Sequence, residues 1–148
     1  MSPAISDLAS SALNDAARVV ERLDAKSFEA FPQAIVAART IALHGLGREG
    51  LQMKGLAMRV FHLGLDAHVV GEMTTPPVAA GDLLVCCAGP GDFASIAALT
   101  KIAKEAGAKT AMVTAQPASA LAKSADHVLR IPAQTMADDQ GATTSVLP

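Results

Sequence analysis

Short apolar segments alternate with helical patterns along the chain, and this alternation constrains the fold more than any other feature of the sequence. Five apolar runs of strand length predict strands at 40–44, 66–70, 82–87, 109–114 and 127–131. Before and between them, apolar residues recur at helical spacing, which predicts helices at 5–23, 27–38, 48–63, 93–106 and 118–123. Strands that alternate with helices form right-handed crossovers and a parallel sheet covered on both faces. The sequence therefore predicts an α/β fold, a three-layer α/β/α sandwich with a five-stranded parallel sheet.

Length and composition indicate one domain and exclude several classes of protein. A chain of 148 residues can bury one core, so we assign residues 1–132 to a single domain with N-terminal helices and residues 133–148 to an irregular tail. The net charge of −2, without any basic run, argues against nucleic-acid binding. No apolar run is long enough to cross a bilayer, and the N-terminus lacks the basic start of a signal peptide. We expect a cytoplasmic protein without membrane or nucleic-acid partners.

Polar, glycine-rich segments follow the first three predicted strands. They are HGLGREG at 44–50, VVGEMTTPP at 69–77 and CCAGPGDF at 86–93. Open parallel sheets bind ligands at the carboxyl ends of their strands, near the point where the strand order reverses. The third segment also leads into a helix, and such a loop offers free N–H groups to an anion. We therefore predict that these loops form a ligand site.

The cysteines and most histidines are interpreted as structural residues. Cys86 and Cys87 are neighbours in one predicted strand and point to opposite faces, which argues against a mutual disulfide and against shared metal ligation. His44, His68 and His127 lie in or beside strands, and only His44 is left open as a residue that overlooks the ligand site. We predict neither a metal site nor a cofactor.

The first loop also fits the dinucleotide-binding pattern G-x-G-x-x-G through Gly45, Gly47 and Gly50. Glu72 follows at a spacing suited to a ribose-binding acid. However, Glu49 would place a carboxylate in the helical turn that receives the pyrophosphate, and the chain has no second half for nicotinamide and substrate. A dinucleotide-binding domain is therefore the less favoured alternative.

Residues 41–92 are similar to a known family in the same order and at the same spacing. Relatives read GAGRSG where this chain has GLGREG at 45–50, followed by an AMR…HLG helix and a VVGE-x-x-TP loop. The matching residues are Ala57, Met58, Arg59, His62, Leu63, Gly64, Val69, Val70, Gly71, Glu72, Thr75 and Pro76. Residues 105–133 resemble the later half of the same family. The chain thus resembles the sugar isomerase (SIS) domain, and in particular the 6-phospho-3-hexuloisomerases.

The resemblance implies a flavodoxin-like SIS fold, a small sugar or sugar phosphate as ligand, and isomerisation of a ketose phosphate. Moving a carbonyl between neighbouring sugar carbons needs a general base that carries a proton across an enediol. The matching segments offer His62 and Glu72 as candidate catalytic residues. The candidate ligand-binding residues are Gly45, Gly47, Arg48, Glu49, Thr74, Thr75, Ala88, Gly89, Pro90, Gly91, Asp92 and Phe93.

The loop that holds phosphate in the family departs from its pattern here. Relatives carry SGSGET where this chain has AGPGDF, so Ala88, Pro90 and Phe93 replace two serines and a threonine. Glu49 replaces a further serine, and Asp92 is predicted to cap the helix that follows it. Losing three hydrogen bonds of roughly 1.5–3 kcal/mol each weakens phosphate binding by about 10³-fold or more. Two readings stay open: a phosphosugar isomerase with an altered phosphate loop, and a non-catalytic sugar-binding or regulatory SIS module.

Two further expectations concern what completes this domain. The first predicted helix has an apolar surface too wide for one small sheet to cover, so we expect a homodimer or homotetramer, as the resemblance to SIS domains also implies. The 6-phospho-3-hexuloisomerases continue beyond the position of Pro148 into a helix with a glutamate thought to take part in isomerisation. An isomerase built only of these residues is expected to lack that catalytic piece.

Overall fold

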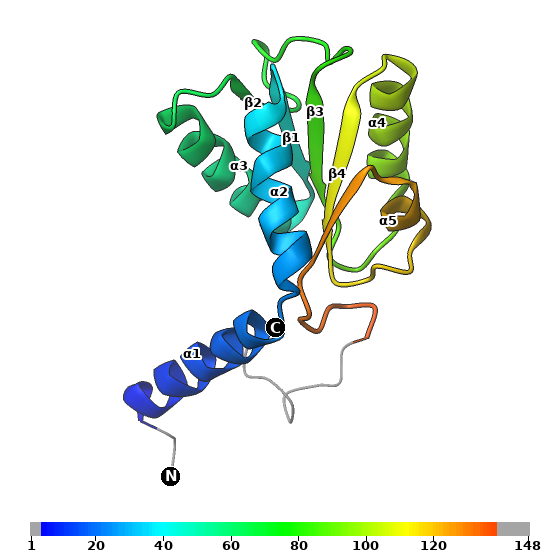
Figure 1. Ribbon diagram of the computed structural model, residues 1–148. Coiled ribbons are helices and arrows are strands. Elements are labelled where there is room, and N and C mark those ends of the chain that lie inside the picture. The colour runs from blue at the N-terminus through cyan, green and yellow to red at the C-terminus, as the bar shows by residue number, and fades with distance from the viewer. Residues whose placement is uncertain (1–3, 139–148) are drawn as a thin grey trace.

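The structure, a computed structural model, describes residues 4–138 as a parallel sheet with helices on both faces. Its elements are α1 (Ile5–Glu21), α2 (Ala25–Ala37), β1 (Ile41–Gly45), α3 (Gly47–His62), β2 (Ala67–Val69), β3 (Leu83–Cys87), α4 (Ala94–Glu105), β4 (Lys109–Thr114), α5 (Ala120–Ser124) and β5 (His127–Arg130). The five strands are parallel and lie in the order β2-β1-β3-β4-β5 (Figure 1). The predicted α/β fold with a five-stranded parallel sheet is confirmed.

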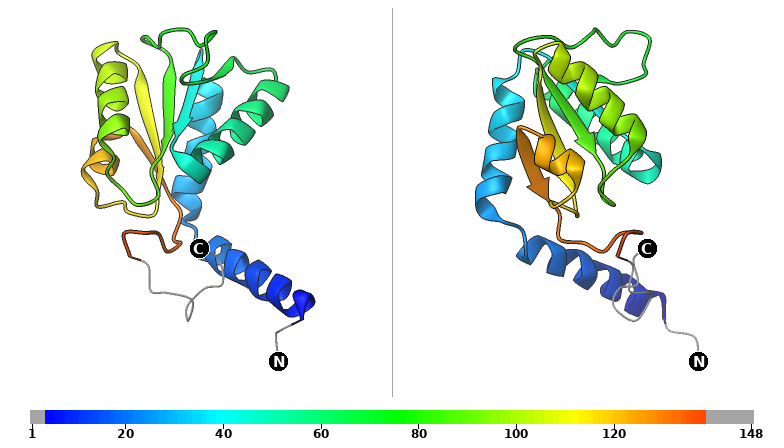
Figure 2. Two further views of the ribbon diagram at one scale, coloured as in Figure 1. Left: turned by 180° about the vertical axis from the view of Figure 1, so that it is seen from behind. Right: turned by 90° about the vertical axis from the view of Figure 1, so that its right-hand side faces the viewer.

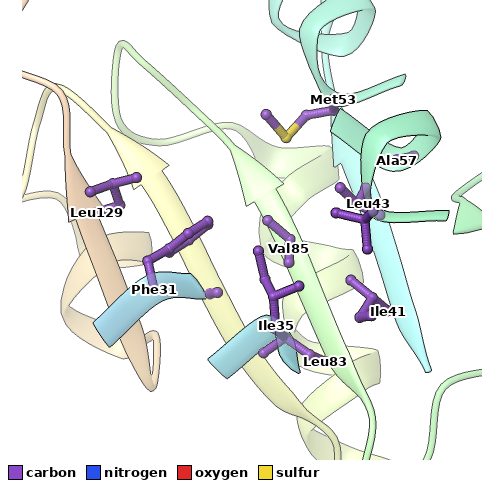
Figure 3. Packing of buried hydrophobic residues seen from close by; sticks show 11 residues of the cluster. Phe31, Ile35, Ile41, Leu43, Met53, Ala57, Leu83, Val85 and Leu129 are labelled. Atoms are coloured by element: carbon purple, nitrogen blue, oxygen red, sulfur yellow. The ribbon is translucent and has the colours of Figure 1, made fainter. Parts of the chain in front are cut away.

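Each face of the sheet is covered by two helices, and the alternation of side chains along the strands creates two separate cores. Helices α2 and α3 pack on one face, where Phe31 and Ile35 of α2 meet strand residues such as Val85 (Figure 3). Helices α4 and α5 pack on the other face through Ile96 and Leu121. The strand residues of this second core are Ala42, Leu84, Cys86 and Met112.

Cys86 and Cys87 lie on opposite faces of β3, as the sequence predicted. Cys86 belongs to the core under α4 and α5, whereas Cys87 packs against the core under α2 and α3. Both thiols are free. Burial raises the pKa of each thiol to about 12, so both remain protonated at neutral pH.

Helix α2 begins two residues earlier than the sequence predicted. Asp24 caps it, because its carboxylate accepts the Ser27 N–H at 2.8 Å. Pro32 lies inside the helix. The helix then runs from the carboxyl edge of the sheet, where the strands end, to the amino edge where β1 begins (Figure 1).

Helix α1 extends away from the sheet at its carboxyl edge, as both views of Figure 2 show. Its large apolar side chains are exposed; they are Ile5, Leu8, Leu13 and Val20. Its C-cap residue Arg22 reaches the segment after β5, donating from Nη2 to the Pro132 carbonyl at 3.0 Å. Within the predicted tail 133–148, residues 133–138 form no helix or strand, and the remaining ten lie outside the described residues. Among the described helices, none is both long and apolar enough to span a bilayer.

Candidate functional site: the loops after β1 and β3

The strand order reverses between β1 and β3, and the candidate site lies at this position. Neighbouring strands β1 and β3 run in register from Ile41↔Leu83 to Gly45↔Cys87, so both end at the same level. The chain leaves β1 into α3 on one face and leaves β3 into α4 on the other. In sheets of this order, the two departing loops border a crevice that binds ligands. The structure thus brings the first and third predicted loops together.

A close approach between helix and strand explains the glycine spacing of the first loop. A Cβ on Gly50 would lie 2.5 Å from the carbonyl oxygen of Gly45, and one on Gly45 would lie 3.0 Å from the Gly50 nitrogen. Gly47, which begins α3, has a positive φ of 52°. Glycines at these three positions are therefore needed for the turn itself, whatever ligand it serves.

Glu49 joins the first loop to the third. It lies in the first turn of α3, and its Oε1 accepts the Gly89 N–H at 2.9 Å. Its other oxygen, Oε2, is buried and has no hydrogen-bond partner among residues 4–138. A Cβ on Gly89 would lie 2.4 Å from Oε1, so only glycine permits this approach. The carboxylate therefore occupies a backbone donor of the loop after β3.

The other donors of the loop at 88–91 are also used within the protein. The Ala88 N–H donates to the Val113 carbonyl at 2.9 Å, and the Gly91 N–H donates to the Ala88 carbonyl at 3.0 Å. Pro90 has no N–H. With Gly89 bound to Glu49, no backbone donor of this segment is left for an anion.

Three loop residues predicted to bind ligand have structural partners within the chain. The Asp92 carboxylate accepts the N–H groups of Ala120 and Leu121 at 3.2 and 2.8 Å. It therefore holds the start of α5, and the prediction that it caps its own helix is wrong, because Phe93 is the N-cap of α4. Ala88 is fully buried, and both Ala88 and Phe93 pack in the core under α4 and α5.

The second predicted loop, after β2, has both exposed polar side chains and one that is bonded to the backbone. Glu72 and Thr74 are exposed in the turn after β2, where the Thr75 N–H donates to the Glu72 carbonyl at 3.1 Å. The Thr75 hydroxyl donates to the Val69 carbonyl at 2.5 Å and is thereby committed to the backbone. Glu72 is the free carboxylate that this loop offers to a ligand.

The two candidate catalytic residues are not brought together within one chain. His62 is the last residue of α3, which runs from the carboxyl edge back to the amino edge of the sheet (Figure 1). Glu72 follows β2, which runs in the opposite direction. His62 is exposed, as is Arg48 in the first turn of α3.

His44 has a feature that the sequence did not reveal. Its Nε2 is buried at the end of β1 without a hydrogen-bond partner among residues 4–138, and burial lowers its pKa. A neutral imidazole with one free nitrogen therefore lies next to Gly45. His68 has a structural partner, since its Nε2 lies 2.9 Å from Asp66 Oδ1. No three His, Cys, Asp or Glu side chains in the described part of the chain cluster as metal ligands.

Comparisons with known proteins agree with this fold. The model of the SIS domain family matches residues 34–148. The 3-hexulose-6-phosphate isomerase of Mycobacterium gastri is 37% identical over 84% of this chain and 63% of its own length. That of Bacillus subtilis is 36% identical over 77% of this chain and 62% of its own length. The chain thus spans just under two thirds of these curated relatives.

A solved structure is similar in fold as well as in sequence. The crystal structure of a Methanococcus jannaschii protein, from which a molecular function of 3-hexulose-6-phosphate isomerase was inferred, is 27% identical. The similarity has a TM-score of 0.69 and covers 74% of this chain and 62% of that one. The sheet and its covering helices are therefore shared with a protein of this inferred function.

Proposed function

The chain belongs to the SIS domain family, and from this premise we propose that it binds an open-chain sugar where the loops after β1 and β3 meet and isomerises a ketose there. The observation that carries the proposal is the bond from Gly89 to Glu49, which joins the two loops at the switch point. The relatives named 3-hexulose-6-phosphate isomerase support a carbonyl shift as the reaction. A cytoplasmic setting, where the two free cysteines stay reduced, belongs to the same proposal.

In this proposal, Glu72 is the general base that transfers the proton between the two neighbouring carbons of the sugar. An enediol mechanism needs a base that takes a proton from one carbon and returns it to the next. Glu72 is an exposed carboxylate on the loop after β2, the strand beside β1. His62 lies toward the other edge of its own sheet, so we assign it to the site of a second copy of the chain. Sites shared between subunits are what the resemblance to SIS domains implies.

Turnover of 3-hexulose 6-phosphate to fructose 6-phosphate tests this function. We expect the chain to catalyse the conversion at substrate concentrations that saturate a weak site, and Glu72→Gln to lower kcat by about 10²- to 10⁴-fold because the general base is lost. Glu105→Gln is the matched control, since Glu105 is an exposed acid at the end of α4. Turnover that survives Glu72→Gln unchanged would refute the role of Glu72.

A second function is favoured by a specific observation. Every backbone donor at 88–91 is already used, and one is held by Glu49, which leaves a poor phosphate site. A non-catalytic module that binds a sugar for regulation does not need free backbone donors for a phosphate. Sugar binding without turnover in the same assay would support this second function and overturn the first.

The proposed site also requires self-association. Helix α1 exposes a row of large apolar residues that no described part of the chain covers, and a symmetric partner is the occupant we propose. Light scattering at micromolar concentration should give the mass of a dimer or tetramer. Leu13→Glu should reduce that mass toward the monomer, whereas Met73→Glu, a change at a fully exposed loop residue, should not. A monomeric mass for the unmodified chain would contradict the proposal.

A further inference from the structure

We propose that Glu49 makes this site selective for a sugar whose end group is uncharged and donates a hydrogen bond, in preference to a phosphosugar. The inference rests on the proposed sugar site and narrows its ligand class to unphosphorylated ketoses and polyols. Three observations on the loops after β1 and β3 carry it: an occupied donor, an uncompensated charge and an unsatisfied acceptor.

The donor that an anion would use is already occupied. The Gly89 N–H is bound to Glu49 Oε1 at 2.9 Å, and the neighbouring donors of Ala88 and Gly91 are bound to backbone carbonyls. A phosphate entering here must first break the bond between Glu49 and Gly89. Within residues 88–91 it gains only this one N–H group in exchange, since Pro90 supplies none.

The charge of Glu49 is not compensated by a basic side chain. Among residues 4–138, no ion pair joins Glu49 to a lysine, arginine or histidine. Arg48, its neighbour in the chain, is exposed. Two like charges about 4 Å apart weaken binding on the order of 10³-fold at an effective dielectric constant near 20. A phosphate dianion beside this carboxylate is therefore strongly disfavoured.

The free oxygen of Glu49 requires a donor, which a sugar hydroxyl provides and a fully ionised phosphate does not. Oε2 is buried without a partner among the described residues, and an unsatisfied buried acceptor is unfavourable. The Cys87 thiol stays protonated, because burial, the charge of Glu49 and a hydrogen bond to the Glu49 carboxylate raise its pKa to about 12. A sugar hydroxyl is a stronger donor to this carboxylate than the thiol is. The Thr135 methyl lies over Gly89, 3.5 Å from the place of a Cβ there.

Calorimetric titration with fructose and fructose 6-phosphate tests the inference. For the unmodified chain we expect fructose to bind at least as tightly as fructose 6-phosphate. Glu49→Ser should shift the ratio of the two dissociation constants by at least about 30-fold toward the phosphosugar, because it removes the charge and frees the Gly89 N–H. Glu49→Gln, which removes the charge and keeps the shape, should shift the ratio in the same direction.

Glu105→Ser is the control, because it changes the net charge equally at an exposed position and should leave the ratio unchanged. Circular dichroism and thermal unfolding confirm that each variant is folded. Tighter binding of fructose 6-phosphate than of fructose by the unmodified chain, with no gain in Glu49→Ser, would overturn the inference while the proposed sugar site stands. Failure of both sugars to bind any folded variant would instead overturn the sugar site itself.

Discussion

Replacing Gly50 with alanine should lower the free energy of unfolding by about 3 kcal/mol, because the added methyl has no room. Its Cβ would lie 2.5 Å from the Gly45 carbonyl oxygen, a backbone atom at the end of β1 that cannot move without disturbing the central strands. The start of α3 would have to move away from the sheet. Urea unfolding followed by circular dichroism measures the change.

The matched control for this prediction lies on the same helix. Gly55 is exposed, and a Cβ there would meet no atom within 4 Å. Gly55→Ala should therefore stabilise the protein by about 0.5–1 kcal/mol, since alanine favours the helix. Equal effects of the two substitutions would show that Gly50 is not held against β1 and would contradict the close approach at the switch point.

Replacing Arg39 with methionine should destabilise the fold at neutral pH, because it leaves a buried carboxylate without its cation. Asp82 is 2% exposed and accepts from Arg39 Nε and Nη2 at 3.0 and 3.1 Å. Arg39 itself is 66% exposed, so solvent screening reduces the cost below that of a fully buried pair. Chemical unfolding at pH 7 measures the loss.

The same substitution has a defined pH dependence. The hydrogen bonds and charge of Arg39 lower the pKa of Asp82 in the folded chain. A carboxyl group with a lowered pKa stabilises the fold above its unfolded value near 3.8, and this contribution is lost as the pH falls through the folded value. The difference in unfolding free energy between the unmodified chain and Arg39→Met should therefore shrink below pH 4. If this difference in unfolding free energy stays constant into the acid range, the ion pair between Arg39 and Asp82 does not stabilise the fold.

The architecture could be predicted from sequence because burial imposes a local period. Each strand is a short, mostly apolar segment and each helix carries an apolar stripe, so the order and type of the elements follow from residues that are neighbours in the chain. The ends of elements were less well defined. Strand β2 is limited to Ala67–Val69, although the Asp66 carbonyl still accepts the Ile41 N–H at 2.8 Å. Val70 still donates its N–H to the Leu43 carbonyl at 2.9 Å.

The interior of the site could not be predicted because its bonds join residues far apart in sequence. Glu49 in the first turn of a helix looks like a favourable dipole contact, and nothing local indicates that it bonds to Gly89, 40 residues later. Asp92 likewise looks like a cap of the helix beside it, yet it holds the start of α5, which begins at Ala120. The sequence indicated which loops lie at the carboxyl ends of the strands, and packing decided which of their donors are free.

The amide resonance of Gly89 offers the most direct test of the site. In a ¹⁵N-labelled protein, Glu49→Ala should shift this resonance, because the N–H loses its carboxylate acceptor. Adding fructose to the unmodified chain should shift the Gly89 amide together with amides in the first turn of α3. If neither Glu49→Ala nor fructose shifts the Gly89 resonance, and the shifts are confined to other parts of the chain, the ligand site does not lie where Glu49 contacts Gly89.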